Sequence, residues 1–144
     1  MRNCCSATKA IIVFAVAIAL LGCSGPKIPA EWGKRLDFLG SDLFYTPAVT
    51  EAEARALGDY LVKNAFFTKE RKGTVQLDKK DGVYQFRMVA DETKIKNPEF
   101  LNLTGNFAAT LSYDLFNKQK LEIHLCDQKF NTLQAVGFEI GGSK

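Results

Sequence analysis

The sequence has few of the residues that most often carry chemistry. Its 144 residues include one histidine, His124, and one tryptophan, Trp32. It contains no G-x-S-x-G nucleophile elbow, no phosphate-cradling glycine loop and no C-x-x-C pair. These absences exclude the motif-bearing serine hydrolases, nucleotide-binding proteins and thiol oxidoreductases. An enzyme whose site follows no motif is the least supported class that stays open.

The sequence also lacks a long hydrophobic run. The longest apolar stretch extends from Ala10 to Leu21, after Arg2 and Lys9. A membrane-spanning helix needs about 20 apolar residues, whereas a basic start before a run of this length is typical of a secretory signal. Residues 1–22 are therefore predicted to be a signal peptide, with an uncleaved anchor as the alternative.

The apolar run ends at Leu20-Leu21-Gly22-Cys23, which resembles the processing signal of bacterial lipoproteins. The resemblance implies that Cys23 becomes a lipidated first residue and that the protein faces the periplasm from a membrane of the cell envelope. If the bacterium is Gram-negative, Ser24 implies the outer membrane rather than the inner one, because an aspartate at this position resembles an inner-membrane retention signal. Two or more acyl chains would hold the protein stably, whereas one holds it only marginally. A signal cleaved without lipidation is the alternative.

Without residues 1–22 the chain has little net charge and one unmodified cysteine. Loss of Arg2 and Lys9 leaves 17 basic and 16 acidic residues, a formal charge of +1 instead of +3. This balance does not favour nucleic acid or an acidic substrate as a partner. Cys126 would have no disulfide partner, so burial of apolar side chains must hold the domain together.

Hydrophobic periodicity predicts one α+β domain over residues 35–140, after a lipidated tether at 23–34 and before a tail at 141–144. The segment from Asp91 to Lys96 is predicted to be a polar loop. The expected elements are strands 35–39 and 42–46, a helix from Thr50 to a left-handed stop at Asn64, strand 74–78 and its hairpin partner, a helix from Asn97 to Phe116, and strands 121–126 and 132–140.

One hairpin has a particularly strong signal. Asp81-Gly82 is typical of a two-residue hairpin turn. With that turn, Leu77 pairs with Phe86 on one face and Gln76 pairs with Arg87 on the other. Apolar pairs then share one face and polar pairs the opposite face, as a consistent register requires.

Both helices have recognisable starts and apolar stripes. Thr50-Glu51-Ala52-Glu53 is a capping box, and Asn97-Pro98-Glu99 combines a cap with proline in the first turn. Gly58, beside the first stripe, predicts close packing against the sheet. The residues expected to be buried are Ala54, Leu57, Leu61 and Ala65 in the first helix and Phe100, Leu103, Phe107, Leu111 and Leu115 in the second.

The order strand, helix, hairpin, helix, strand predicts a ferredoxin-like split βαβ fold, βαββαβ, with extra N-terminal and C-terminal strands. Two helices are expected to pack on one face of an antiparallel sheet, and the other face is expected to be exposed.

The domain also resembles a bacterial family of exported or membrane-attached proteins. The resemblance covers roughly Leu36 to Val136 and rests on fold-bearing motifs, so it implies no activity and no functional residues. The motifs are Tyr45-Thr46, Val49-Thr50-Glu51-Ala52-Glu53-Ala54, Leu57-Gly58-Asp59-Tyr60-Leu61, Phe66-Phe67, Val75-Gln76-Leu77, Tyr84-Gln85-Phe86-Arg87 and Leu125-Cys126-Asp127.

Polar residues are expected to cluster on the exposed sheet face. They are Gln76, Gln85, Arg87, Glu122 and His124. They predict a docking surface, with a solvated face of cross-strand pairs as the alternative. We therefore expect a non-catalytic envelope lipoprotein that acts by protein contact and needs no cofactor. A small-ligand or metal-binding module on the same face is the alternative.

Three weaker interpretations depend on small groups of residues. His124, Cys126 and Asp127 have the side chains of a zinc or copper site, although an exported site usually recruits more than one histidine. A Cys126/His124 nucleophile pair is disfavoured because same-face neighbours on a strand lie about 6.6–6.8 Å apart. The basic residues Lys69, Arg71, Lys72, Lys79 and Lys80 suggest contact with anionic lipid headgroups, or an ordinary solvated rim.

Overall fold

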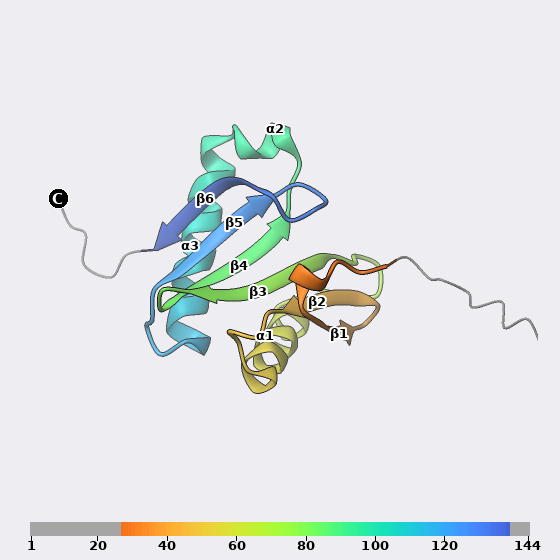
Figure 1. Ribbon diagram of the computed structural model, residues 1–144. Coiled ribbons are helices and arrows are strands. Elements are labelled where there is room, and N and C mark those ends of the chain that lie inside the picture. The colour runs from red at the N-terminus through yellow and green to blue at the C-terminus, as the bar shows by residue number, and fades with distance from the viewer. Residues whose placement is uncertain (1–26, 139–144) are drawn as a thin grey trace, which may run out of the picture.

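A computed structural model describes residues 27–138, and Figure 1 shows their arrangement. In chain order the elements are η1 (Ala30–Trp32, a 3₁₀ turn), β1 (Lys34–Phe38), β2 (Ser41–Tyr45), α1 (Glu51–Lys63), β3 (Thr74–Lys80), β4 (Val83–Val89), α2 (Glu92–Ile95), α3 (Pro98–Leu115), β5 (Leu121–Cys126) and β6 (Thr132–Phe138).

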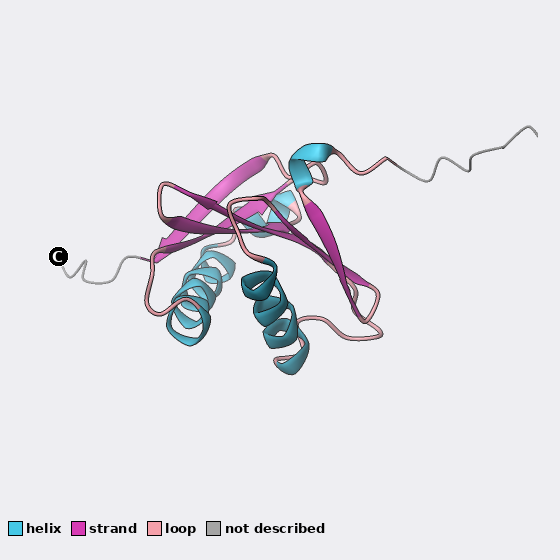
Figure 2. Ribbon diagram, turned by 60° about the horizontal axis from the view of Figure 1, so that its bottom comes forward, coloured by secondary structure: helices cyan, strands magenta, loops and turns pink. Residues whose placement is uncertain are grey.

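The six strands form one mixed sheet whose spatial order is the chain order, from β1 at one edge to β6 at the other. The β2–β3 and β4–β5 pairs are parallel, and the remaining pairs are antiparallel. The chain connects the parallel strands through α1 and α3, which lie on the same face of the sheet (Figure 2). The predicted α+β fold with two helices on one face is confirmed, but the sheet is mixed rather than antiparallel.

The ferredoxin-like split arrangement is not confirmed. In that arrangement another strand lies between the two parallel strands of each βαβ unit, and the first strand has two neighbours from the second half of the fold. Here both parallel pairs are directly adjacent, and the β1–β2 hairpin occupies the second edge of β2. Because a strand has only two edges, this hairpin leaves no place beside β2 for β4 or β5.

The central β3–β4 hairpin has the predicted register. Leu77 pairs with Phe86, and Asp81 and Gly82 both have positive φ, 51° and 80°. Two positive φ angles are what a type I′ hairpin turn requires. In the N-terminal hairpin the turn lies at Leu39-Gly40, one residue earlier than the sequence predicts.

The capping box at the start of α1 is confirmed. Thr50 Oγ1 accepts a hydrogen bond from the Glu53 amide (3.2 Å), and the Glu53 carboxylate accepts one from the Thr50 amide (2.8 Å). Burial alone would raise the pKa of Glu53, but hydrogen bonds from Thr50 and Tyr84 outweigh it and hold the pKa below its ordinary value. Glu53 therefore stays ionised and connects the helix start to β4.

The cap of α3 is also confirmed, and it follows a turn that the sequence analysis missed. Asn97 Oδ1 accepts a hydrogen bond from the Glu99 amide (2.9 Å). In the segment predicted as polar loop, Asp91 Oδ1 accepts one from the Thr93 amide (2.8 Å) and caps the single turn α2. A capped turn this short has no apolar period to reveal it.

The helices approach the sheet through small side chains. The buried residues of α3 are Thr104, Ala108, Leu111 and Ser112. The predicted burial of Leu111 is confirmed, whereas Leu103, also predicted to be buried, is 61% exposed. The sequence analysis expected the bulky side chains of α3 to face the sheet. Three of the four buried residues are small instead, because small side chains allow the helix to lie closest to the sheet. In α1, a Cβ built on Gly58 would lie 2.0 Å from the Phe38 ring, which confirms the predicted close approach.

The left-handed residue at the end of α1 is Ala65, one position after the predicted stop. Asn64 has φ −94°, whereas Ala65 has φ 55°. The turn brings the amides of Phe66 and Phe67 to the Leu61 carbonyl, at 2.8 and 3.1 Å. Phe67 thereby enters the core, where it is 1% exposed.

We expect Ala65→Gly to stabilise the protein. A left-handed backbone costs a non-glycine residue about 1–2 kcal/mol, and the greater freedom of glycine in the unfolded chain offsets about 0.5–1 kcal/mol of that gain. The free energy of unfolding, measured by urea denaturation, should rise by up to about 1 kcal/mol. Asn64→Gly is the control and should lower stability, because its backbone does not need glycine. A loss of stability in Ala65→Gly would contradict the assignment.

Candidate functional site

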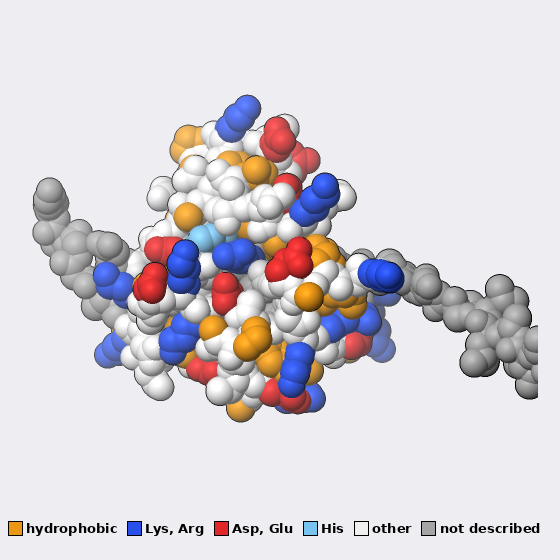
Figure 3. All heavy atoms as spheres, viewed as in Figure 1, with side chains coloured by type: hydrophobic (Ala, Val, Ile, Leu, Met, Phe, Trp, Pro, Cys, Tyr) orange, Lys and Arg blue, Asp and Glu red, His pale blue; other side chains and the backbone are white. Residues whose placement is uncertain are grey.

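The sheet face opposite the helices is partly covered, and Figure 3 views this face. Trp32 of η1 packs edge-on against Phe44 of β2 and Phe130 of the β5–β6 loop, with ring centroids 5.2 and 4.9 Å away. Cys126 completes this apolar cluster on the outer face of the sheet, and its members other than Trp32 are at most 4% exposed. The face is therefore not the open polar surface that strict alternation predicts.

Gln76 belongs to the structural part of this face. Its side chain Nε2 donates to the backbone carbonyls of Glu31 (3.2 Å) and Trp32 (3.1 Å). These two bonds connect β3, in the middle of the sheet, to η1. The predicted exposure of Gln76 is wrong, because η1 lies over it and leaves it 2% exposed.

Arg87 lies in the polar part of the face. Its Nη2 donates to Gln85 Oε1 (2.8 Å) and lies 3.7 Å from the Asp78 carboxylate. Its Nε is buried and has no hydrogen-bond partner among the described residues. Gln85 is 8% exposed, so it orients the guanidinium and is not the exposed contact residue that was predicted.

His124 has both ring nitrogens engaged. Its Nε2 lies 3.0 Å from Glu122 Oε2, and its Nδ1 lies 2.9 Å from Thr132 Oγ1. Because a carboxylate only accepts, Nε2 carries a proton. Like Gln76 and Gln85, His124 is buried rather than exposed. The five predicted contact residues do share one face, but only Arg87 and Glu122 are more than slightly accessible.

Cys126 has the properties of a structural thiol. Its Sγ donates to the backbone carbonyl of His124 (3.3 Å), not to the imidazole. Burial raises the pKa of the Cys126 thiol, so it stays protonated at neutral pH. Since the thiolate is the nucleophile and the metal ligand, this environment supports neither role.

The weak metal-site interpretation gains no support from the geometry. Asp127 is directed at its own loop, where its carboxylate accepts from the amides of Lys129 (2.8 Å) and Asn131 (2.9 Å). The Asn131 side chain also donates to it and is the main cause of the lowered pKa of Asp127. Across residues 27–138, no three His, Cys, Asp or Glu side chains are grouped so that they could hold a metal ion.

The basic residues suggested to contact lipid headgroups have different surroundings. Lys79 Nζ lies 3.1 Å from the Tyr84 hydroxyl and 4.2 Å from the centre of its ring. Arg71 instead extends over a pocket on the helix face, where it donates to the Ala65 carbonyl. These two side chains therefore do not act together as one headgroup-binding patch.

The two edge strands differ in charge, a feature that the sequence analysis missed. β1 has three charged residues, Lys34, Arg35 and Asp37, whereas β6 has none between Thr132 and Phe138. Most of β6 is exposed, and Leu133 is 44% exposed. Charges on an edge strand discourage pairing with another chain, so β1 is protected and β6 is not. The signal, a seven-residue strand without charge, is present in the sequence.

Cys23, residues 1–22 and the predicted tail lie outside the described residues, so lipidation stays a prediction. Part of the predicted tether is described and contains η1, which packs on the sheet. No helix between residues 27 and 138 has both the length and the apolar character to cross a membrane.

Comparison with known protein families gives a match over most of the described residues. The model of a protein family, described as a family N-terminal domain, matches residues 36–138, from within β1 to the end of β6. No curated protein and no solved structure matches the chain. The match thus covers all of the sheet except the first two residues of β1, together with its helices, and its description contains no activity.

Proposed function

The chain belongs to the AF_1994_N family, whose model describes an N-terminal domain, and we propose that this domain is a non-catalytic contact module of the cell envelope. A lipid on Cys23 tethers it to a membrane, preferentially the outer one, with the domain facing the periplasm. β6 binds an extended segment of another envelope protein. One observation carries the proposal: β6 is an exposed edge strand without a charged side chain.

Strand addition explains how β6 would bind. One edge of β6 pairs with β5, and its other edge pairs with no described strand. An added strand makes main-chain hydrogen bonds that supply affinity, while its alternate side chains supply specificity. Glu122 of β5 pairs with Gly137 of β6. Because glycine has no side chain, no side chain of β6 stands between the Glu122 carboxylate and a strand added next to β6. A basic residue in the partner segment would complement Glu122.

The outer face supports a ligand-binding role less well. Gln76 and His124 already have hydrogen-bond partners within the fold. Trp32 and Phe44 line a pocket of about 800 Å³ on this face, but none of the five polar residues predicted to form the contact surface lines it. We therefore propose protein contact at β6 instead of ligand or metal binding on this face.

Site-specific photo-crosslinking in intact envelopes tests this proposal. A photo-crosslinking residue in place of Gln134 should give an adduct with a second protein, and Leu133→Lys in the same chain should lower the yield about tenfold, because a charge on the edge opposes strand addition. Leu103→Lys is the matched control, since it places the same charge at an exposed leucine of α3. It should leave the yield unchanged.

Two results would overturn the proposal. Equal yields from the Leu133→Lys and Leu103→Lys chains would show that the contact does not depend on β6. An adduct that contains only two copies of this chain would replace the envelope partner by self-association.

A further inference from the structure

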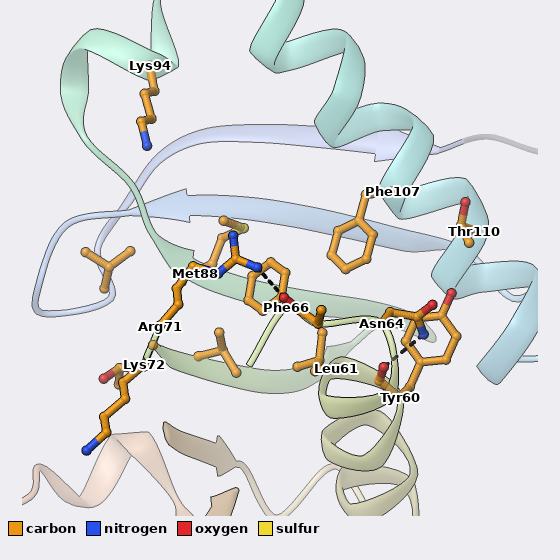
Figure 4. A pocket seen from close by; sticks show the side chains of 15 residues that line it. Tyr60, Leu61, Asn64, Phe66, Arg71, Lys72, Met88, Lys94, Phe107 and Thr110 are labelled. Atoms are coloured by element: carbon orange, nitrogen blue, oxygen red, sulfur yellow. Dashed lines mark hydrogen bonds between the residues drawn. The ribbon is translucent and has the colours of Figure 1, made fainter. Parts of the chain in front are cut away.

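A pocket of about 790 Å³ opens on the helix face of the sheet, away from the β6 edge (Figure 4). The end of α1, the loop after it, the start of β3, the end of β4 and the middle of α3 line it. Its volume falls within the range of about 300–1,000 Å³ that is typical of small-ligand sites. None of the five residues predicted to form the docking surface lines this pocket, whereas Arg71 and Lys72, which the sequence suggested as contacts for lipid headgroups, do line it.

The floor of the pocket is apolar. Leu61, Phe66, Val75, Met88 and Phe107 contribute to it. The Phe66 and Phe107 rings are stacked, with centroids 5.7 Å apart and an interplanar angle of 6°. A ligand that fills this space must have an apolar body, because a small hydrated anion would leave the floor uncovered.

The charged residues that line the pocket are all basic. They are Arg71, Lys72 and Lys94, and no Asp or Glu lines it. Each of the other arginines between residues 27 and 138 lies within 4.0 Å of a carboxylate, whereas Arg71 has no such partner in that part of the chain. Arg71 thus has an unused capacity for a charge-assisted, bidentate contact with an anion.

The left-handed turn after α1 orients Arg71. Its Nη2 donates to the carbonyl of Ala65, the residue with φ 55°. At the other end of the loop, the Arg71 amide donates to Thr68 Oγ1 (2.8 Å). In Figure 4 the Arg71 guanidinium lies beside Phe66 and Met88 rather than extending away from the pocket. This arrangement places a cation next to the apolar floor.

We propose that this pocket binds a fatty-acid anion, with its carboxylate at Arg71 and its acyl chain over Phe66, Met88 and Phe107. The basic lining requires an anionic ligand, and the apolar floor requires that this ligand carry an acyl chain. Lys94, which approaches from α2, contributes to the same positive potential. Binding here is independent of strand addition at β6, so the two proposals can fail separately.

The test uses the full chain in nanodiscs of neutral phosphatidylcholine, titrated with carboxyl-¹³C dodecanoate and followed by NMR. Empty nanodiscs give the signal of dodecanoate that has only entered the bilayer. The ¹³C signal of a carboxylate held by Arg71 should saturate as dodecanoate is added. The pKa of this carboxylate, read from a pH titration of the same signal, should be lower than in empty nanodiscs, because a neighbouring cation favours the ionised form. Burial in lipid alone shifts it in the opposite direction.

Matched variants separate the pocket from general charge effects. Arg71→Ala should weaken dodecanoate binding about tenfold, the effect of losing a hydrogen bond to a charged group. Lys94→Ala, which removes no described side-chain hydrogen bond, should weaken it about twofold to fivefold. Arg55→Ala removes the same charge from a surface pair with Glu51 and should change nothing. Circular dichroism confirms that each variant is folded.

Three outcomes would overturn the inference. They are the absence of a saturable dodecanoate signal, equal affinity for uncharged dodecanol, and equal weakening by Arg55→Ala and Arg71→Ala. Short-chain butyrate should bind much more weakly than dodecanoate, and equal binding of the two would show that the apolar floor is not used.

Discussion

Phe86→Ala is expected to lower the free energy of unfolding by about 3–5 kcal/mol. The Phe86 ring is 0% exposed and lies where β4 meets the helices. Its centroid is 6.2 Å from that of Phe66 and 6.0 Å from that of Phe107, in edge-to-face contacts. Alanine would remove the apolar contacts and leave a cavity that these neighbours cannot close, because β5 and α3 hold the surrounding residues in place.

Urea-induced unfolding, followed by circular dichroism, measures this loss. Domains of this size have about 5–15 kcal/mol of stability in total, so the variant should unfold at a much lower urea concentration. Leu103→Ala is the control, because it removes a similar apolar volume from an exposed site and should change stability by less than about 0.5 kcal/mol. A loss below about 1 kcal/mol in Phe86→Ala would contradict the placement of this ring at the centre of the core.

The second large effect is expected at the junction of η1 and β1. Gly33 has φ 82° and ψ −150°, a conformation that favours glycine. A Cβ at Gly33 would lie 2.0 Å from the Tyr45 carbonyl oxygen and 3.0 Å from the Thr46 Cα. These are backbone atoms at the end of β2, which is paired on both edges and cannot move away. Gly33→Ala therefore forces η1 off the sheet.

The loss of stability in Gly33→Ala combines backbone strain with lost contacts. When η1 leaves, Gln76 loses its two carbonyl acceptors, and the Trp32 ring loses Phe44 and Phe130. We expect Gly33→Ala to lower the free energy of unfolding by about 2–4 kcal/mol. The emission of the single tryptophan should shift to longer wavelength in the folded state, as Trp32 becomes exposed to water.

Gly82→Ala separates the two causes. Gly82 has nearly the same φ, 80°, but a Cβ there would meet nothing within 4 Å. It should show only the conformational cost, about 1–2 kcal/mol, and leave Trp32 emission unchanged. Equal losses in the two variants would mean that neither the contact with Tyr45 nor the ψ of −150° at Gly33, which is essentially restricted to glycine, adds to the cost.

Local structure could be predicted because it depends on residues close together in the chain. The Thr50 capping box, the Asn97 cap and the Asp81-Gly82 hairpin were all predicted and are all present. In each case a turn or helix end is fixed by hydrogen bonds over three or four residues. The buried face of β3 and β4 followed from the same register, and Leu77 and Phe86 are indeed fully buried.

The strand order and the outer face could not be predicted in the same way. Parallel pairing of β2 with β3 joins residues such as Leu43 and Val75, which are separated by the whole of α1. The alternation in β3 shows that Gln76 points away from the helices, but it contains no information about what lies above it. Trp32 covers Gln76 from 44 positions away along the chain. Burial on that face therefore depends on a contact that no local pattern encodes.

The attachment of η1 has a mechanical consequence. Force applied at Lys27 reaches the sheet through η1, which is held by the two Gln76 bonds and the packing of Trp32. β1 is held by a ladder of five residue pairs with β2. Under tension η1 should therefore detach before the ladder opens. Each released residue would lengthen the connection by at most about 3.3–3.6 Å while the sheet stays intact.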